Sequence, residues 1–202
     1  MWVQIWHEAP NLHPHVLLIT PNPKEPNEAQ VEKLPLRLYS SKIKLDFREG
    51  IGRMQPEALI IRPFQHADQP ACRALVLAGL EEHWGWLDLT LNPDLDDIAA
   101  TYRGGVFLTA WLEGDLVGTG ALLPAGPGVY QVARMSVVQR LRGHGLGRRI
   151  LSCLEEHARG AGAARLVLET TATWEDAVAF YLRCGYTLTH HQDGDVFFEK
   201  KI

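Results

Sequence analysis

The sequence predicts an α/β fold, with a mixed, mostly antiparallel central sheet of about seven strands and flanking helices. Two observations support this prediction. Short apolar segments are joined in places by tight-turn residues, such as Glu113-Gly114-Asp115 and Asp193-Gly194, which favour antiparallel hairpins. Elsewhere such segments alternate with stretches of helical period, which favour parallel crossovers. The expected order is strand, two helices, three strands, helix, strand, helix and two strands.

Each element is predicted from a local pattern. The apolar segments predict strands over residues 58–61, 106–112, 116–123, 129–138, 165–169, 186–189 and 196–199. A first helix is expected after Asp68, its predicted N-cap, and a second, short helix over 95–102. A third helix begins near Leu146, because apolar residues recur from there on one face. A fourth spans 174–184, and Thr173 to Asp176 resemble a capping box at its start.

The first 53 residues differ from the rest of the chain. They hold half of the 12 prolines and show no sustained apolar period. We therefore expect 1–53 to be a poorly ordered N-terminal extension and 54–202 to be the folded domain. A structural arm packed on the domain is the alternative, and so is an upstream region translated from a wrong start. Expression of 54–202 alone distinguishes these possibilities, because an arm would be needed for folding.

Composition narrows the classes of partner. The net charge is −4, so the chain has no general basic field to hold nucleic acid or an anionic membrane. Neither partner is expected, and any anion site must be local. The 3 cysteines show neither metal spacing nor a disulfide framework, and the histidines belong to no HExxH motif, so no metal is expected. Reduced cysteines and the lack of a long apolar span favour a cytoplasmic location.

The stretch from Gln139 to Arg149 joins a predicted strand to a predicted helix. It carries glycines at 143, 145 and 147 and arginines at 140, 142, 148 and 149. The first amides of a helix lack partners within the helix, and the helix dipole adds partial positive charge there. Glycines let the backbone come close to a ligand. The stretch therefore predicts a pyrophosphate-binding loop.

Other phosphate loops fit less well. A Walker loop requires Gly-Lys-Ser/Thr, which is absent. A dinucleotide-binding fingerprint requires G-x-G-x-x-G, whereas the glycines here follow G-x-G-x-G. Glu169 lies where a ribose-binding acid could be, but antiparallel hairpins precede the loop, so a nucleotide-dependent oxidoreductase is a weaker alternative. A turn with solvated arginines would not explain three glycines at a helix start.

Arg134-Met135-Ser136-Val137, followed by Arg140-x-x-Gly143-x-Gly145, resembles the GNAT superfamily of acetyl-CoA-dependent N-acyltransferases. The resemblance extends from about Ile60 to Glu199. It implies a GNAT-like sheet, acetyl-CoA as co-substrate, and direct attack of a primary amine on the thioester in a ternary complex. The acceptor would be a small-molecule or protein amine, and a homodimer is one expected assembly. The alternative is a non-catalytic acyl-CoA-binding or regulatory module.

The resemblance also implies how the co-substrate would bind. The pyrophosphate would lie on the amides from Arg142 to Gly147, and the pantetheine arm along the backbone of 135–137. The Val137 N–H would polarise the thioester carbonyl. The expected co-substrate residues are Met135, Ser136, Val137, Arg140, Arg142, Gly143, His144, Gly145, Leu146, Gly147 and Arg148.

Two catalytic residues follow from the same resemblance. The segment from Ala177 to Tyr186 resembles the family's A-x-x-F/L-Y-x-x-x-G-F/Y pattern. Tyr181 would protonate the departing thiolate, although a packed core tyrosine is the alternative. Glu169 would accept the amine proton, or would only pair with an arginine. Many members of the family have Asn where this chain has Trp174.

The acceptor pocket is expected in the segment from Glu81 to Asn92, which joins two helices in this family. Trp84, Trp86 and Asp88 would give it aromatic walls and one acid suited to a cationic amine, and Glu82 is a further expected acceptor-binding residue. The tryptophans could equally be buried anchors of an irregular segment. Glu81 and Glu82 are weaker candidates for the base.

Overall fold

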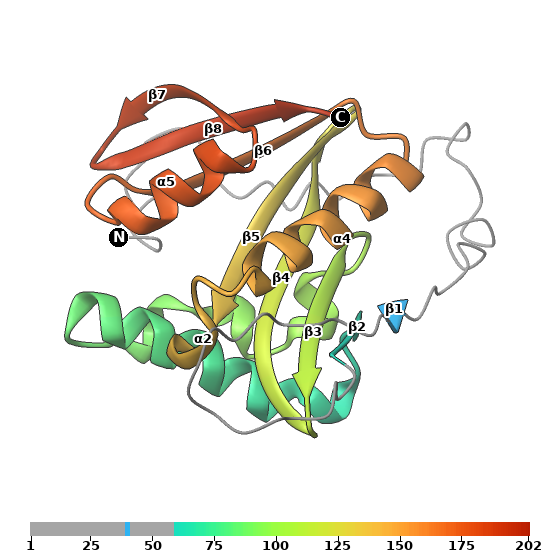
Figure 1. Ribbon diagram of the computed structural model, residues 1–202, viewed down its shortest axis with the longest axis vertical. Helices are drawn as coiled ribbons and strands as arrows, with labels where there is room; N and C mark the ends of the chain where they lie inside the picture. The colour runs from blue at the N-terminus through green and yellow to red at the C-terminus, as the bar shows by residue number, and fades with distance from the viewer. Residues whose placement is uncertain (1–38, 41–58) are drawn as a thin grey trace. The chain divides into compact units, whose positions relative to one another are not determined.

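The computed structural model describes residues 39–40 and 59–202 (Figure 1). The chain divides into two compact units, Met1–Arg37 and Leu38–Ile202, and only the second contains described residues. The predicted extension over 1–53 therefore lies outside the described residues, apart from strand β1 (Tyr39–Ser40), which pairs antiparallel with β2 (Ile60–Pro63). The boundary at residue 54 stays a prediction.

The second unit contains one eight-stranded sheet, in the order β1-β2-β3-β4-β5-β6-β8-β7. Every neighbouring pair is antiparallel except β5 and β6, which are parallel. The predicted mixed, mostly antiparallel sheet is confirmed, and short β1 adds a strand to those expected. The remaining strands are β3 (Val106–Leu112), β4 (Asp115–Gly126), β5 (Val129–Val137), β6 (Arg165–Thr171), β7 (Thr187–Gln192) and β8 (Asp195–Lys201).

Two-residue turns fix the register of two hairpins, β3–β4 and β7–β8. Glu113 and Gly114 join β3 to β4 with φ of 56° and 87°, and Asp193 and Gly194 join β7 to β8 with φ of 51° and 88°. Positive φ at both positions is the type I′ geometry, whose twist matches that of paired strands. The tight turns therefore lie where the sequence predicted hairpins.

The helices differ from expectation at two places. The single helix expected over 95–102 is divided between η4 (Pro93–Leu95) and α3 (Ile98–Thr101). The capping box expected from Thr173 is wrong, because Trp174 is the N-cap of α5 and no side chain caps that helix. The other helical elements are η2 (His66–Asp68), α2 (Gln69–Trp84), η3 (Leu89–Leu91), η5 (Gln139–Leu141), α4 (Leu146–Gly160) and α5 (Glu175–Arg183). In the part of the chain that the structure describes, no helix combines the length and apolar character needed to cross a bilayer.

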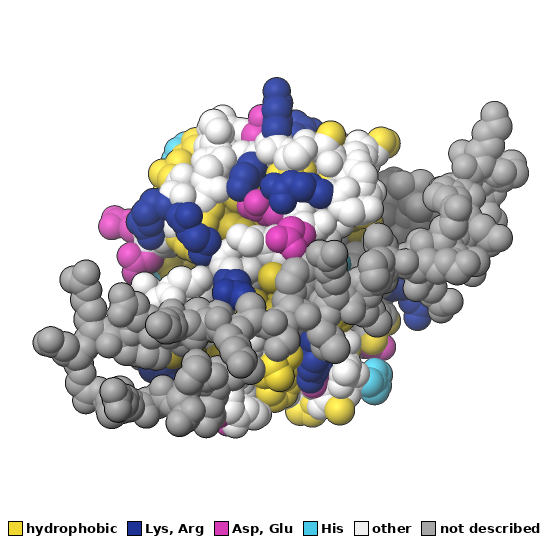
Figure 2. Space-filling view, turned by 45° about the vertical axis from the view of Figure 1, so that its right-hand side comes forward, with side chains coloured by type: hydrophobic (Ala, Val, Ile, Leu, Met, Phe, Trp, Pro, Cys, Tyr) yellow, Lys and Arg dark blue, Asp and Glu magenta, His cyan; other side chains and the backbone are white. Residues whose placement is uncertain are grey.

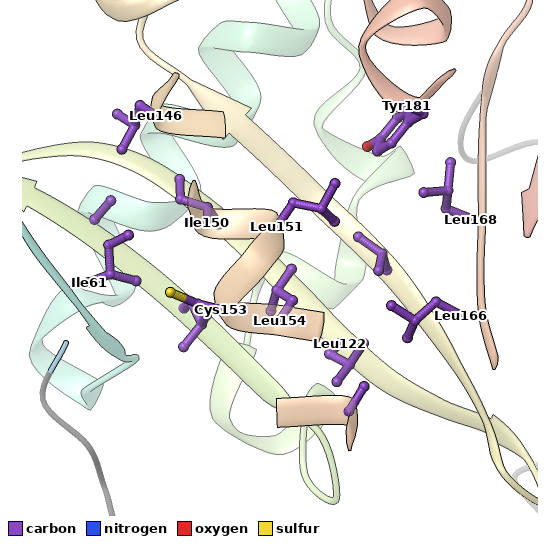
Figure 3. Close-up of a cluster of buried hydrophobic side chains, with 14 of the residues drawn as sticks. Ile61, Leu122, Leu146, Ile150, Leu151, Cys153, Leu154, Leu166, Leu168 and Tyr181 are labelled. Atoms are coloured by element: carbon purple, nitrogen blue, oxygen red, sulfur yellow. The ribbon is translucent and has the colours of Figure 1, made fainter. Parts of the chain in front are cut away.

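Hydrophobic clusters cover both faces of the sheet. Helix α4 packs Ile150, Leu151 and Leu154 against one face, with strand residues such as Leu122 and Leu166 (Figure 3). Helix α2 packs on the other face with α3, through a cluster that includes Cys72, Val76, Leu77, Ile98 and Phe107. Neighbouring residues of one strand, such as Phe107 and Leu108, belong to different clusters, as expected when successive side chains alternate between faces.

Strands β5 and β6 pair over a short length only. Val129–Gln131 lie opposite Arg165–Val167, and beyond these residues the two strands diverge (Figure 1). Among the described residues, the second half of β5 therefore has no partner strand on that side. This separation lies next to the loop that leads from β5 into α4, and the two features together define the candidate site.

Candidate active site

The loop from Val138 to Gly145 connects β5 to the first turn of α4. Gly143 and Gly145 have φ of 77° and 84°, a left-handed conformation that favours glycine. No described atom lies within 4 Å of a Cβ placed at either position. Gly145 is the N-cap of α4, and no described side chain caps the helix. No described side chain therefore occupies the first amides of α4, which are groups of the kind that bind anions.

The third glycine of the motif has a different role. Gly147 lies inside α4, and a Cβ there would be 3.5 Å from the Phe180 ring, an ordinary contact. Leu146 beside it is 4% exposed and anchors the helix start in the core. Of the three glycines, Gly143 and Gly145 therefore adopt the left-handed conformation that favours glycine, and Gly147 does not.

The arginines around the loop contact several elements. Arg140 lies 3.7 Å from Asp115 in an exposed ion pair. Arg148 donates to the carbonyl of Arg183, the last residue of α5, at 2.8 Å. His144 Nδ1 lies 2.8 Å from the Arg142 carbonyl. In the part of Figure 2 that is not grey, Lys and Arg side chains form small groups, several beside Asp or Glu. On the part of the surface that Figure 2 shows, positive side chains therefore alternate with negative ones.

Arg142 connects the loop to helix α2. Its Nη1 and Nη2 donate to the two carboxylate oxygens of Glu82 at 2.9 and 2.8 Å. Its Nε donates to the carbonyl of Val137, at the end of β5, at 2.9 Å. The structure thus joins a residue expected to bind the co-substrate to one expected to bind the acceptor.

A cavity of about 350 Å³ lies between the C-terminal half of α2, the glycine loop and the start of α5. His83 and Trp174 both line it and stack on each other, with ring centroids 4.2 Å apart and planes 12° from parallel. Glu82 and Arg142 are its lining residues that the sequence predicted. The others are Gly79, His83, Thr173, Trp174, Glu175 and Asp176. The sequence had marked Trp174, because many members of the family that it resembles have Asn at that position. Nothing in the local sequence marked His83.

Helix α2 packs closely on the end of β5. A Cβ at Gly79 would lie 3.1 Å from Ser136 Oγ, tighter than most contacts of that kind. Ser136 therefore faces α2, and Met135 and Val137 pack on the cluster of the other face. The three residues expected to contact the pantetheine arm form the end of β5 beside its separation from β6.

Tyr181 is 7% exposed and belongs to the same cluster as Leu151 and Leu168 (Figure 3). Its ring contacts those of Phe180, Tyr186 and Phe198 at centroid distances of 5.1, 5.8 and 5.9 Å. Burial, and to a lesser degree Cys184, raises the pKa of the Tyr181 phenol above its ordinary value. The residue therefore keeps its proton near neutral pH. Its packing fits both an acid at the site and a structural tyrosine.

Glu169 is half-buried on β6, directly after Leu168. Because successive residues of a strand face opposite sides, Glu169 points away from the cluster that contains Leu168 and Tyr181. Burial, followed by the charge of Asp195, raises the pKa of the Glu169 carboxyl. The two expected catalytic groups thus lie on opposite faces of the sheet at β6, the strand that borders the separation.

The two tryptophans expected in the acceptor pocket do not line the cavity. Trp86 is 63% exposed, so it is not a buried anchor either. Trp84 is half-buried, with its ring 4.5 Å from that of His83. Among the described residues, no group of three or more His, Cys, Asp or Glu side chains is suited to hold a metal ion.

Comparisons with known proteins identify the family of the chain. The sequence model of the acetyltransferase (GNAT) family matches residues 64–186. The chain is 26% identical over 144 residues to the uncharacterized N-acetyltransferase YjgM of Escherichia coli (strain K12). The aligned region covers 67% of this chain and 86% of that protein. It is 40% identical over 81 residues to an IAA acetyltransferase of Azospirillum brasilense, covering 40% of this chain and 53% of the other.

Solved structures share the fold. A GNAT-family acetyltransferase of Staphylococcus aureus Mu50 superposes with a TM-score of 0.67 at 18% identity, over 71% of this chain and 99% of that one. The PaiA N-acetyltransferase of Thermoplasma acidophilum, solved with coenzyme A, superposes with a TM-score of 0.64 at 14% identity, over 71% of this chain and 99% of that one.

Proposed function

Because the chain belongs to the GNAT acetyltransferase family, we propose that it transfers the acetyl group of acetyl-CoA to a primary amine, by direct attack of the amine in a ternary complex. Membership of this family implies that the chain is an acyl-CoA-dependent acyltransferase. The use of acetyl-CoA, the direct attack and the roles of individual residues are parts of the proposal.

One observation carries the proposal: beyond Gln131, the edge of β5 that faces β6 has no partner strand among the described residues, and it lies next to the N-terminus of α4, which no described side chain caps. The amide groups of a pantetheine arm can pair with free backbone groups along such an edge. The diphosphate of the same molecule can lie on helix amides that no side chain caps. A single extended ligand with both groups therefore suits the site, and coenzyme A has both. The coenzyme A complex of the PaiA N-acetyltransferase, which has a similar fold, supports this choice.

The proposed chemistry uses groups on both faces of the sheet. The amine nitrogen forms a bond to the thioester carbonyl carbon, and the carbon–sulfur bond breaks. Glu169 takes the proton that the amine loses, and its raised pKa suits a base that works nearer neutrality. Tyr181 gives a proton to the departing sulfur. The same apolar surroundings would raise the pKa of the coenzyme A thiol. The departing thiolate would then bind a proton more tightly, which favours this transfer.

Calorimetric titration with acetyl-CoA tests the proposal. We expect binding in the micromolar range, lost in Gly145→Val, because a branched side chain at φ 84° strains the loop and fills the space beside it. Gly162→Val is the matched control, since Gly162 follows the other end of α4 with φ 78° and equally open space. The control variant should be strained to a similar degree and still bind.

Absence of acetyl-CoA binding by well-folded protein would overturn the proposal. If binding is found, release of free thiol is then measured with a panel of small-molecule amines and peptides with free N-termini. Binding without turnover of any amine would favour the non-catalytic acyl-CoA-binding module.

A further inference from the structure

Arg134 interrupts β5 just before the residues expected to contact the thioester. Thr119 lies opposite Ser136 and Ala121 lies opposite Ala133, so Arg134 and Met135 both face Gly120 in a β-bulge. Arg134 has φ 50°, a conformation that is unfavourable for a residue with a side chain and that its surroundings must maintain. The hydroxyl of Thr119 donates to the Arg134 carbonyl at 2.9 Å, which helps to hold the bulge.

The Arg134 side chain lies in a polar network on the α2 face of the sheet. Its Nε donates to Asp94 Oδ2 at 2.8 Å, and its Nη2 donates to the other Asp94 oxygen. Its Nη1 donates to Asn92 Oδ1 at 3.0 Å, and the Tyr102 hydroxyl donates to Asp94 Oδ2 at 2.8 Å. The Arg134 side chain is only 12% exposed. Burial by itself would lower the pKa of the guanidinium, but Asp94 raises it above the ordinary value, so Arg134 stays charged.

This network connects the two halves of the candidate site. Arg134 directly precedes Met135–Val137, the backbone expected to contact the pantetheine arm and the thioester carbonyl. Asn92 is the last residue of the segment where the acceptor is expected, and Asp94 lies two positions beyond it, still in the connection between α2 and α3. One side chain therefore links the co-substrate strand to the acceptor segment.

We propose that Arg134 is a positioning residue, whose ion pair with Asp94 holds the bulge so that the Val137 N–H points at the thioester carbonyl. This inference rests on the proposed function. Arginine suits the role because its planar guanidinium reaches both Asp94 oxygens and Asn92 at once, whereas lysine has a single ammonium group. The pair also fixes the acceptor segment at a constant distance from that N–H.

The bound co-substrate itself reports on this role. A hydrogen bond to the carbonyl of acetyl-CoA labelled with ¹³C at that carbon moves its NMR resonance downfield of the free ligand. In Arg134→Lys, at saturating acetyl-CoA, we expect the resonance to return most of the way to the free position while the ligand still binds. Turnover with any accepted amine should fall at least about tenfold, or ~1.4 kcal/mol.

Arg62→Lys is the matched control. Arg62 of β2 donates to both carboxylate oxygens of Asp68 at 2.6 and 2.9 Å and lies in neither half of the site. This variant should lose stability in a thermal melt and keep the wild-type resonance. If the role of Arg134 were purely structural, Arg134→Lys would likewise lose stability and keep the wild-type resonance. If Arg134→Lys does not fold, Asp94→Asn, which removes the charge and keeps the shape, should show the same loss of shift.

The outcomes separate this inference from the proposed function. Wild-type protein that does not bind acetyl-CoA would overturn the proposed function and the inference with it. Wild-type protein that binds and shows the downfield shift, with the same shift in folded Arg134→Lys or Asp94→Asn, would overturn the inference alone.

Discussion

The Arg142 guanidinium and the Glu82 carboxylate form a two-point ion pair that joins the glycine loop to helix α2, with N–O distances of 2.9 and 2.8 Å. The same guanidinium donates to the Val137 carbonyl, one of the backbone groups expected to pair with the pantetheine arm. A diphosphate bound at the loop would compete with Glu82 for Arg142. Binding of acetyl-CoA would then leave the carboxylate free to attract a cationic amine.

Glu82→Gln is therefore expected to strengthen acetyl-CoA binding. Both side chains are about two-fifths exposed, so the pair contributes at most about 1 kcal/mol, and the gain in affinity is at most about fivefold. Titration calorimetry at low and high salt measures it, and the gain should shrink as salt screens the pair. Glu81→Gln, an exposed neighbour, is the control. Weaker binding by Glu82→Gln would contradict the competition.

Tyr181→Phe is expected to reduce turnover by about a hundredfold or more, because a positioned general acid contributes that much. The affinity for acetyl-CoA should change little, since the aromatic ring remains in the cluster. Steady-state kinetics with an accepted amine gives both quantities. Tyr186→Phe removes the hydroxyl of another buried tyrosine, 3% exposed, and should keep full turnover. Equal turnover of wild type and Tyr181→Phe would identify Tyr181 as a packing residue.

Glu169→Gln is expected to lower turnover by about a hundredfold and to stabilise the fold at neutral pH. Because burial raises the pKa of the folded carboxyl, the folded state binds more protons than the unfolded state between the two pKa values. The stability of the wild type therefore decreases as pH rises through that window, and glutamine removes the effect. Thermal melts from acid to neutral pH measure this difference.

The pH dependence of turnover gives an independent test of Glu169. The wild-type rate should rise with pH as this carboxyl loses its proton, at a higher pH than an ordinary glutamate would require. The glutamine variant should lack that rise. A wild-type rate that depends only on the ionisation of the amine would remove Glu169 from the mechanism.

Lys200→Met is expected to destabilise the protein by roughly 2 kcal/mol. Its ammonium group donates to Glu155, which is 6% exposed, at 2.7 Å, and to the Cys184 carbonyl just after α5 at 2.9 Å. Loss of the ammonium leaves a buried carboxylate whose remaining ion-pair partner among the described residues is Arg159, at the longer distance of 3.4 Å. Chemical denaturation measures the loss, with exposed Lys201→Met as control. An unchanged midpoint would contradict the importance of the pair.

The sequence predicted those features whose cause is local. Gly114 and Gly194 marked hairpin turns because their positive φ is a property of the turn itself. The apolar period that begins at Leu146 marked the start of α4, and the helix does begin at that residue. The prediction failed at α5, where Trp174 rather than Thr173 is the N-cap, and the stack of Trp174 on His83 is a tertiary contact that a capping pattern does not include.

The assembly of the site could not be predicted, because its contacts join residues far apart in the chain. Arg142 and Glu82 are 60 positions apart, and Arg134 and Asp94 are 40 apart. Nothing near Arg134 marks it as a bulge residue with positive φ, since glycine is the usual residue there. The resemblance to a family located Tyr181 and Glu169, but their placement on opposite faces of the sheet became evident only from the strand register.

The short pairing of β5 with β6 has a mechanical consequence. Three residue pairs connect the two strands, fewer than connect any other neighbours from β2 to β8, so the hydrogen-bond ladder of this part of the sheet is shortest along that line. Strands β6 to β8 and helix α5 form a lobe whose local opening should require the least free energy in the unliganded protein. A co-substrate lying along the gap would supply backbone bonds that the strands do not give each other. It would then act as a temporary strand of the sheet, and each round of product release would remove that strand and loosen the lobe.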